Sequence, residues 1–232
     1  MDTPHYHTAL IVGAGPGLSA SLARLCARAG MNVALAARRT DKLAGLCAET
    51  GASAHECDAR DPPAVAALFE AVEARHGAPD LVVYNASARV RGPVTELDPE
   101  AVRLALEVSA FGAFLVAQQA ARRMLAQGRG AIALTGATAG VKGFANSSSF
   151  ALGKFALRGL AQSLARELSP QGIHVAHFVI DGGIRDAARL DPAAADSTLD
   201  PDAIALTYWH VLHQHRSAWS WEVEVRPWVE RF

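Results

Sequence analysis

Three glycines near the N-terminus have the spacing of a phosphate-binding turn. Gly13, Gly15 and Gly17 follow the apolar run 10–12, and a predicted helix begins at Leu18. Glycines let the backbone turn sharply and approach a pyrophosphate, whose negative charge is favoured by the free N–H groups at a helix start. A strand, a glycine turn and a helix in this order are typical of a dinucleotide site. A glycine turn that merely packs a helix against a sheet has the same composition, so a second signal is needed.

Two arginines provide that second signal. Arg38 and Arg39 come directly after the next predicted strand, residues 32–37. At this position an Asp or Glu holds the ribose 2′-hydroxyl of NAD, whereas an Arg matches the 2′-phosphate of NADP. No acidic residue stands at this strand end, so the sequence predicts NADP rather than NAD. The alternative is that the two arginines are a solvated surface pair.

The spacing of the glycines distinguishes three classes of protein. The flavoprotein pattern G-x-G-x-x-G fits Gly13 and Gly15, but its third glycine falls one residue early, at Gly17. A methyltransferase needs an acidic residue after the second strand, where Arg38 stands. The pattern G-x-x-x-G-x-G fits at Gly13 and Gly17 and fails only at Ser19. On this pattern the chain resembles the short-chain dehydrogenase/reductase family, with the last glycine lost.

Further segments carry the resemblance in the same order and spacing as the family. The stretch 85–87, Asn-Ala-Ser, is similar to the family's Asn-Ala-Gly turn, which lines the cofactor. Residues 131–140 resemble its fifth-strand segment, and residues 149–160 resemble its active-site helix. Residues 180–184 stand where the family has a Pro-Gly turn beside the nicotinamide. The resemblance covers about residues 8 to 184. The C-terminal segment from 206 to 230 looks like that of a divergent subgroup of the same family.

This resemblance implies a set of cofactor-binding residues. Asp58, after the third predicted strand, corresponds to the family residue that accepts a hydrogen bond from the adenine amino group. A turn residue at a helix start is the alternative role for Asp58. The implied set for NADP(H) is Gly13, Gly15, Gly17, Leu18, Arg38, Arg39, Asp58, Asn85, Ala86, Lys154, Gly182 and Ile184.

The family's catalytic pattern is incomplete in this sequence. The family places a Tyr and a Lys four residues apart on one helix face; the Lys lowers the pKa of the Tyr and hydrogen-bonds the nicotinamide ribose. A Ser on strand five and an Asn on the preceding long helix complete the set. Lys154 is present, but the Tyr, Ser and Asn positions are occupied by Phe150, Ala137 and Ser109. Phenylalanine has no proton to give, so three of the four roles are vacant.

The vacancies limit the rate rather than exclude a reaction. General acid catalysis is worth roughly 10²–10⁴ in rate and one carbonyl-polarising donor roughly 10²–10³. Proximity of hydride donor and acceptor still contributes effective molarities of about 10⁵ M or more. A slow reductase, or one with another acid, remains compatible with the sequence. Five hydroxyl side chains could replace the missing tyrosine as proton donor, although a capping or packing role is favoured for each. They are Tyr84, Thr138, Ser147, Ser148 and Ser149.

The apolar pattern alternates between strand-like and helix-like segments along the chain, which predicts a doubly wound parallel α/β sheet in a single domain. The resemblance implies about seven strands, helices on both faces and the strand order 3-2-1-4-5-6-7. Residues 185–203 are the least regular part and are interpreted as a lid over the site or a plain surface loop. Residues 219–228 alternate as one last strand. Three helices are expected to begin with the same Asp-Pro device, at Asp61-Pro62, Asp98-Pro99 and Asp200-Pro201.

Composition restricts partners and location. The chain has 232 residues and a net charge of −1, which gives no electrostatic case for nucleic acid or an anionic membrane. No apolar run approaches the roughly 20 residues that span a bilayer, and the N-terminus lacks the pattern of a signal peptide. The three scattered cysteines predict reduced thiols in a cytoplasmic protein. The histidines at 210, 213 and 215 could suggest a metal, but a solvated helix end is favoured and no metal site is predicted.

These observations predict an NADP(H)-dependent oxidoreductase that moves hydride to or from a small carbonyl, alcohol or activated-alkene substrate by a non-standard proton route. The alternative is a catalytically silent NADP-binding sensor, scaffold or partner subunit. Hydrolase chemistry has no support, because no G-x-S-x-G elbow is present. The resemblance also implies a homodimer or homotetramer formed through the helices near 100–126 and 149–168.

Overall fold

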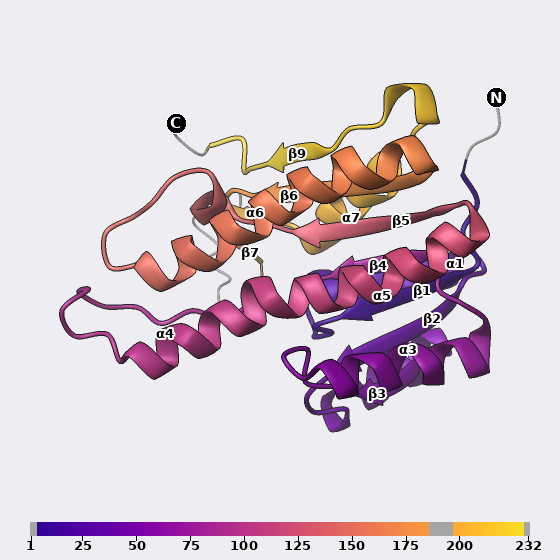
Figure 1. Ribbon diagram of the computed structural model, residues 1–232, viewed down its shortest axis with the longest axis horizontal. Helices are drawn as coiled ribbons and strands as arrows, with labels where there is room; N and C mark the ends of the chain where they lie inside the picture. Colours follow the sequence, from indigo (N-terminus) through magenta and orange to yellow (C-terminus); the bar gives the residue numbers. More distant parts are fainter. Residues whose placement is uncertain (1–3, 186–196, 230–232) are drawn as a thin grey trace.

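The computed structural model describes residues 4–185 and 197–229. One sheet of seven parallel strands runs through the centre of the molecule in the order β3-β2-β1-β4-β5-β6-β9 (Figure 1). This is the predicted order, and the α/β fold with helices flanking one parallel sheet is confirmed. The strands are β1 Thr8–Val12, β2 Asn32–Ala37, β3 Ser53–Glu56, β4 Leu81–Tyr84, β5 Gly130–Thr135, β6 Ile173–Ile180 and β9 Glu222–Val225.

Helices cover both faces of this sheet. Helices α3, α5 and α6 pack on the face toward the viewer in Figure 1, and α1 and α7 pack on the other. Alternate strand residues supply the two cores: Leu10 enters one cluster and Ile11 enters the other. The strands are apolar without interruption because parallel strands are buried on both sides. The helices are α1 Leu18–Arg28, α2 Ala44–Thr50, α3 Pro62–His76, α4 Pro99–Leu106, α5 Gly112–Gln127, α6 Ser148–Leu168 and α7 Pro201–Leu212, with short 3₁₀ turns η1 Asp41–Leu43, η3 Thr138–Gly140, η4 Ser169–Gln171 and η6 Arg216–Ala218.

Two of the three predicted Asp-Pro helix starts are capped as expected. The carboxylates of Asp98 and Asp200 each accept hydrogen bonds from two N–H groups in the first turn of α4 and α7. The expectation is wrong at Asp61, whose side chain caps nothing at the start of α3. Part of the reason is local: Asp98 and Asp200 accept from the N–H groups of the second and third helical positions, whereas in α3 the second position is Pro63, which has none.

Helix α4 does not run uninterrupted into α5. A π-helical turn, Glu107–Phe111 (η2), separates them. The turn packs against the sheet, since the Tyr84 hydroxyl donates a hydrogen bond to the carbonyl oxygen of Val108. Gly112 sits so close to strand β4 that a Cβ there would lie 2.6 Å from the Tyr84 hydroxyl oxygen. Ser109 in this turn hydrogen-bonds Ala88 in the chain that follows β4, and π-turns are frequent at functional sites.

The predicted lid falls largely outside the described residues, because residues 186–196 are not among them. Its two ends are described and form a small parallel ladder, β7 Gly183–Ile184 paired with β8 Thr198–Leu199. The last residues of the predicted lid, from Pro201, belong instead to helix α7.

The structure also describes the cysteines, the lengths of the helices and the last predicted strand. Cys26 and Cys57 are buried, Cys47 is half-buried, and none forms a disulfide. No helix in the described ranges combines the length and apolar character needed to cross a membrane. The predicted last strand is present but shorter than expected, as β9 at the edge of the sheet.

Candidate cofactor and active site

Two adjoining cavities lie along the edge of the sheet where the parallel strands end. The first cavity, about 630 Å³, lies over the ends of β1, β2 and β3 and is lined by residues 12–14, 37–39 and 57–59. The second cavity, about 980 Å³, lies over the ends of β5 and β6. Asn85 and Ser87, which follow β4, line both cavities. Together they form a continuous groove at the edge where open α/β sheets bind ligands.

The glycine turn borders the first cavity, but its glycines have different tasks. Gly13 has a φ of +85°, and a Cβ there would lie 2.3 Å from the backbone nitrogen of Ala86. Gly13 therefore lets the turns after β1 and β4 pack together. A Cβ on Gly15 or Gly17 would meet nothing within 4 Å, so the space beside them is open. Neither glycine lines the cavity, and no side chain caps the start of α1, which leaves its N–H groups available to an anion.

Leu18 and Ser19 begin helix α1 with buried side chains. The Leu18 side chain packs in the core, so only its backbone N–H could serve a cofactor. The Ser19 hydroxyl donates to the carbonyl oxygen of Gly13 (3.1 Å) and accepts from the side-chain amide of Asn85 (2.7 Å). The residue that breaks the glycine pattern thus joins the two turns that border the groove. Sequence reasoning missed this role; its signal is a hydroxyl residue at the lost glycine position.

Arg38 and Arg39 are exposed and line the first cavity beside Asp58. Neither guanidinium has an ion-pair partner within the described part of the chain. Asp58, in contrast, is held by Arg60, whose Nη2 lies 2.6 Å from Oδ2 and whose backbone N–H donates to Oδ1 (3.0 Å). Hydrogen bonding to Arg60 lowers the pKa of Asp58 below its ordinary value.

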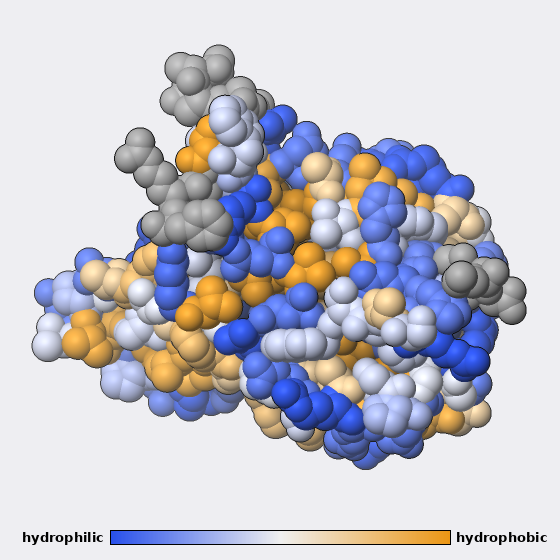
Figure 2. All heavy atoms as spheres, turned by 90° about the horizontal axis from the view of Figure 1, so that it is seen from above, coloured by the Kyte–Doolittle hydropathy of each residue, from blue (hydrophilic) through white to orange (hydrophobic). Residues whose placement is uncertain are grey.

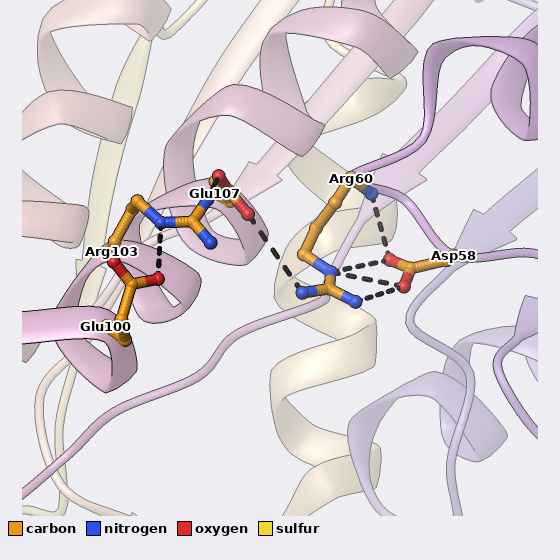
Figure 3. Close-up of polar contacts among 5 residues, drawn as sticks. All are labelled: Asp58, Arg60, Glu100, Arg103 and Glu107. Atoms are coloured by element: carbon orange, nitrogen blue, oxygen red, sulfur yellow. Dashed lines mark hydrogen bonds and ion pairs between the residues drawn. The ribbon is translucent and has the colours of Figure 1, made fainter.

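The Asp58–Arg60 pair is the end of a longer charged network (Figure 3). Arg60 lies 4.0 Å from Glu107 at the start of the π-turn, and Glu107 also pairs with Arg103. Arg103 in turn contacts Glu100 at 2.8 Å. The network ties the turn after β3 to helix α4, and so fixes the Asp58 carboxylate against the π-turn that carries Ser109.

Lys154 lies at the base of the second cavity and is 2% exposed. Its Nζ donates to the carbonyl oxygen of Thr135 (2.7 Å). Burial lowers the pKa of Lys154 from 10.5 to about 8, because the charged form loses its hydration. Phe150, one helical turn earlier, also lines the cavity, with Lys154 Nζ 5.8 Å and the Arg89 guanidinium carbon 5.2 Å from its ring centroid. The apolar Phe150 ring thus has two cations within 6 Å of its centroid.

Two serines near the site bind backbone. The Ser109 hydroxyl accepts from the N–H of Ala88 and donates to its carbonyl oxygen, each at 3.2 Å. The Ser149 hydroxyl does the same with Val90, at 2.9 and 2.7 Å. Both serines therefore fix the segment after β4, and the favoured packing role of Ser149 agrees with the structure.

The hydroxyls of the three tyrosines are all used inside the protein. Tyr6 donates to the carbonyl oxygen of Leu212 (2.7 Å), Tyr84 to that of Val108, and Tyr208 to the hydroxyl of Thr135 (2.9 Å). Burial raises the pKa of each phenol. None of them lines either cavity. Tyr84, considered above as a substitute proton donor, is a packing residue.

Next to Ala137, which lines the second cavity, Thr138 donates its hydroxyl proton to Asp181. Asp181 precedes Gly182 and Ile184, which line the same cavity. Asp181 also lies 3.6 Å from Arg226. The Thr138 hydroxyl, considered above as a substitute proton donor, is thus engaged by a carboxylate.

Gly136 forms the wall of the second cavity over a buried histidine. A Cβ on Gly136 would lie 2.3 Å from Nε2 of His177. His177 Nδ1 lies 3.0 Å from Glu222, which makes a two-point ion pair with Arg158. Burial lowers the pKa of His177. This arrangement depends on three elements far apart in sequence, and no pattern indicated it.

The three C-terminal histidines have separate surroundings. His213 Nδ1 lies 2.8 Å from the carbonyl oxygen of Trp209, and His215 caps the turn Arg216–Ala218. Across residues 4–185 and 197–229, no group of three or more His, Cys, Asp or Glu side chains is arranged to hold a metal ion.

The family described as short chain dehydrogenase matches residues 7–189 of the sequence. The chain belongs to this family. The chain is 35% identical over 172 residues to cis-4-hydroxycyclohexanecarboxylate dehydrogenase of Sinomonas cyclohexanicum, covering 72% of this chain and 69% of that protein. Family members are oxidoreductases that act on small molecules with a nicotinamide cofactor.

Two solved short-chain dehydrogenases show the same fold. The crystal structure of one from Rhodopseudomonas palustris is 36% identical, covers 97% of this chain and 100% of its own, and superimposes with a TM-score of 0.84. A metagenomic short-chain oxidoreductase in complex with NADP is 28% identical, covers 95% and 97% of the two chains, and has a TM-score of 0.82.

Proposed function

We propose that this short-chain dehydrogenase binds NADP(H) and transfers hydride to or from a small organic substrate, with a catalytic set that lacks the family's tyrosine. The observation that carries the proposal is the groove itself. It has at one end two arginines that make no ion pair with the described residues and at the other a buried lysine, and it runs along the ligand-binding edge of the sheet.

The residues along the groove fit the parts of NADP(H) in order. Arg38 and Arg39 would hold the 2′-phosphate, and the Asp58 carboxylate would accept a hydrogen bond from the adenine amino group. The uncapped start of α1, from Gly15 to Leu18, would take the pyrophosphate on its N–H groups. The cofactor, when bound, supplies the hydride. The residues proposed for its nicotinamide half are Asn85, Ala86, Lys154, Gly182 and Ile184.

Lys154 is the group best suited to hold the proton that accompanies the hydride. Phe150 and Ala137 carry no exchangeable proton, and the Ser109 hydroxyl is used by Ala88. The ammonium of Lys154, with a pKa of about 8, can give up a proton near neutral pH. Its loss of a tyrosine partner costs roughly 10²–10⁴ in rate relative to a complete general acid, so slow turnover is expected.

A catalytically silent NADP-binding sensor, scaffold or partner subunit is the second candidate. The observation that favours it is that Phe150 and Ala137, which the resemblance aligns with the family's tyrosine and serine, line the second cavity and bring no hydroxyl to it. Both candidates require the same cofactor site, and they differ in turnover alone.

Two measurements test the proposal. Fluorescence titration should show NADPH binding more tightly than NADH, and Arg38→Ala should remove most of the difference; Arg216→Ala, on the opposite edge of the sheet, should not. Charge-assisted hydrogen bonds of about 1.5–3 kcal/mol predict roughly a 10- to 100-fold preference. Equal affinities for the two cofactors in the wild type would contradict the NADP assignment.

NADPH oxidation over one panel of ketones and activated alkenes then separates the two candidates. The first substrate to try is a cyclic keto acid, because a relative is named for 4-hydroxycyclohexanecarboxylate. If proton transfer is rerouted, the wild type turns over and Phe150→Tyr leaves the rate unchanged or lower. If the protein is silent, only the restored variant Phe150→Tyr/Ala137→Ser gains activity. Ser109→Asn completes the family set as a third change, but Ser109 packs close to Gly153, so the double variant is tested first.

The surface of α4, α5 and α6 supports a homodimer or homotetramer. Phe111 and Phe114 stack with ring centroids 6.3 Å apart. Large apolar side chains stand exposed here, a composition typical of interaction surfaces: Leu104, Phe111, Phe114, Leu125, Leu152 and Phe155. Light scattering of the wild type and Phe155→Asp tests this part, since a charge at the interface should lower the mass. A cytoplasmic location, expected from the cysteines, belongs to the same proposal.

A further inference from the structure

The second cavity has a positively charged lining. Four of its lining residues are basic: Arg89, Arg91, Lys142 and Lys154. Asp181 is the one acidic residue that lines it in the described chain, and that carboxylate already accepts from Thr138 and lies 3.6 Å from Arg226. The charge of the lining is therefore well in excess of what Asp181 balances.

The basic side chains at the mouth come from two loops, one after β4 and one before α6, at the left-hand end of the molecule in Figure 1. The first loop is fixed: serines bind both the N–H and the carbonyl oxygen of Ala88 and of Val90. Arg89 and Arg91 flank these anchored residues. They are thus presented to the cavity from a preorganised backbone, which lowers the entropic cost of binding a ligand.

Aromatic rings lie beneath these cations. The Arg89 guanidinium carbon is 5.2 Å from the ring centroid of Phe150, and Lys142 Nζ is 5.5 Å from that of Phe144. Both rings line the cavity. The mouth therefore combines apolar surface with positive charge, and the space-filling view shows hydrophobic and hydrophilic residues side by side at this end (Figure 2).

The proposed cofactor does not need these charges. Its phosphate groups would be bound by Arg38 and Arg39 in the first cavity and by the start of α1 outside it. The second cavity would receive the nicotinamide, whose carboxamide is neutral, and the substrate. Arg91 and Lys142 at the mouth can therefore serve the substrate.

We propose that the substrate carries a carboxylate, bound at the mouth of the second cavity by Arg91 and Lys142 with Arg89 beside them, while its apolar body lies against Phe144 and Phe150. This inference rests on the proposed function and names the substrate class of the same site. A phosphate on a thioester carrier arm would meet the same cations, and the experiment distinguishes the two anions.

The test compares probes that differ only in charge. NADPH oxidation is measured with 4-oxocyclohexanecarboxylate and with 4-oxocyclohexanecarboxamide. Exposed ion pairs contribute about 0.2–1 kcal/mol each, so Arg91 and Lys142 together predict a preference of roughly 2- to 30-fold in kcat/KM for the acid, falling with added salt. Arg91→Ala and Lys142→Ala should each reduce the ratio of kcat/KM for the acid to that for the amide by roughly 2- to 5-fold. Arg216→Ala, a charge removed from the opposite edge of the sheet, should change neither.

A binding measurement separates this inference from the proposed function. Calorimetric titration of the NADP⁺-saturated protein with cyclohexanecarboxylate and cyclohexanecarboxamide needs no turnover. Selective binding of the carboxylate without turnover of any keto probe would support the anion site and contradict hydride transfer. Equal turnover and equal binding of acid and amide would overturn the inference and leave the proposed function standing.

The last comparison tests whether the cations bind the phosphate of a thioester carrier arm instead of a carboxylate. Acetoacetyl-CoA is compared with the acetoacetyl thioester of N-acetylcysteamine, which has no phosphate. A preference for the CoA thioester, together with no preference for acid over amide, would overturn the carboxylate in favour of a carrier arm. Absence of binding and turnover with every probe would contradict both proposals.

Discussion

Replacing Lys154 by methionine should stabilise the protein at neutral pH. The side chain is 2% exposed, and its burial lowers the pKa from 10.5 to about 8. At pH 7 the folded protein must keep a buried ammonium, at a cost of about 3 kcal/mol from a shift of two to three pKa units. Methionine has a similar volume and no charge. It also loses the hydrogen bond to the Thr135 carbonyl oxygen, worth about 1–2 kcal/mol, so the net gain is about 1–2 kcal/mol.

The pH dependence identifies the cause of this gain. Between pH 8 and 10.5 the unfolded state still binds the lysine proton while the folded state has released it. The stability contributed by Lys154 therefore rises with pH through this window. Its cost falls to about 1 kcal/mol by pH 10, so the advantage of Lys154→Met should vanish there.

Urea denaturation of the nucleotide-free wild type and of Lys154→Met, at pH 7, 8, 9 and 10, measures this difference directly, because titration of other groups cancels. Lys142→Met is the control. Because Lys142 is exposed, the difference in the free energy of unfolding between wild type and this variant should not change with pH. The buried-charge argument would be refuted if the difference in the free energy of unfolding between wild type and Lys154→Met stayed constant within about 0.5 kcal/mol from pH 7 to 10. A residue retained at such a cost fits a functional role rather than a structural one.

Two further predictions concern the cofactor site. Gly13→Ala should lower the free energy of unfolding by about 3 kcal/mol or more, since it combines a positive φ with a backbone clash at Ala86. Gly15→Ala should keep the wild-type free energy of unfolding and weaken NADPH binding. Equal losses of stability in the two variants would contradict the separate roles of the two glycines. Lys154→Ala should weaken binding of intact NADPH in a calorimetric titration while 2′-phospho-AMP binds as before, because the lysine lies in the second cavity and the arginines in the first; parallel losses for both ligands would mean that the change disturbs the whole fold.

Much of the fold could be predicted from the sequence because its signals are local. Continuous apolar runs such as Leu81–Tyr84 indicate strands buried on both faces, and the order of segments from the glycine turn onward implied the strand order that the sheet has. The strand ends also placed Arg38, Asn85 and Gly182 at one edge, since parallel strands all end there. The cap at Asp61 failed for an equally local reason, the second proline, which could have been taken into account.

The candidate site was predicted only as far as single positions go. The sequence alone determined that a phenylalanine stands four residues before Lys154, that two arginines directly follow the second strand, and that a serine stands at position 19 after the glycine turn. The tertiary structure decided what these positions touch. Ser19 holds Asn85 across 66 residues, and His177 reaches Glu222 across 45. Arg91 and Lys142 converge on one cavity from two loops. Spacing along the chain specifies elements of regular geometry, but contacts between elements depend on how their side chains pack, which no local pattern encodes.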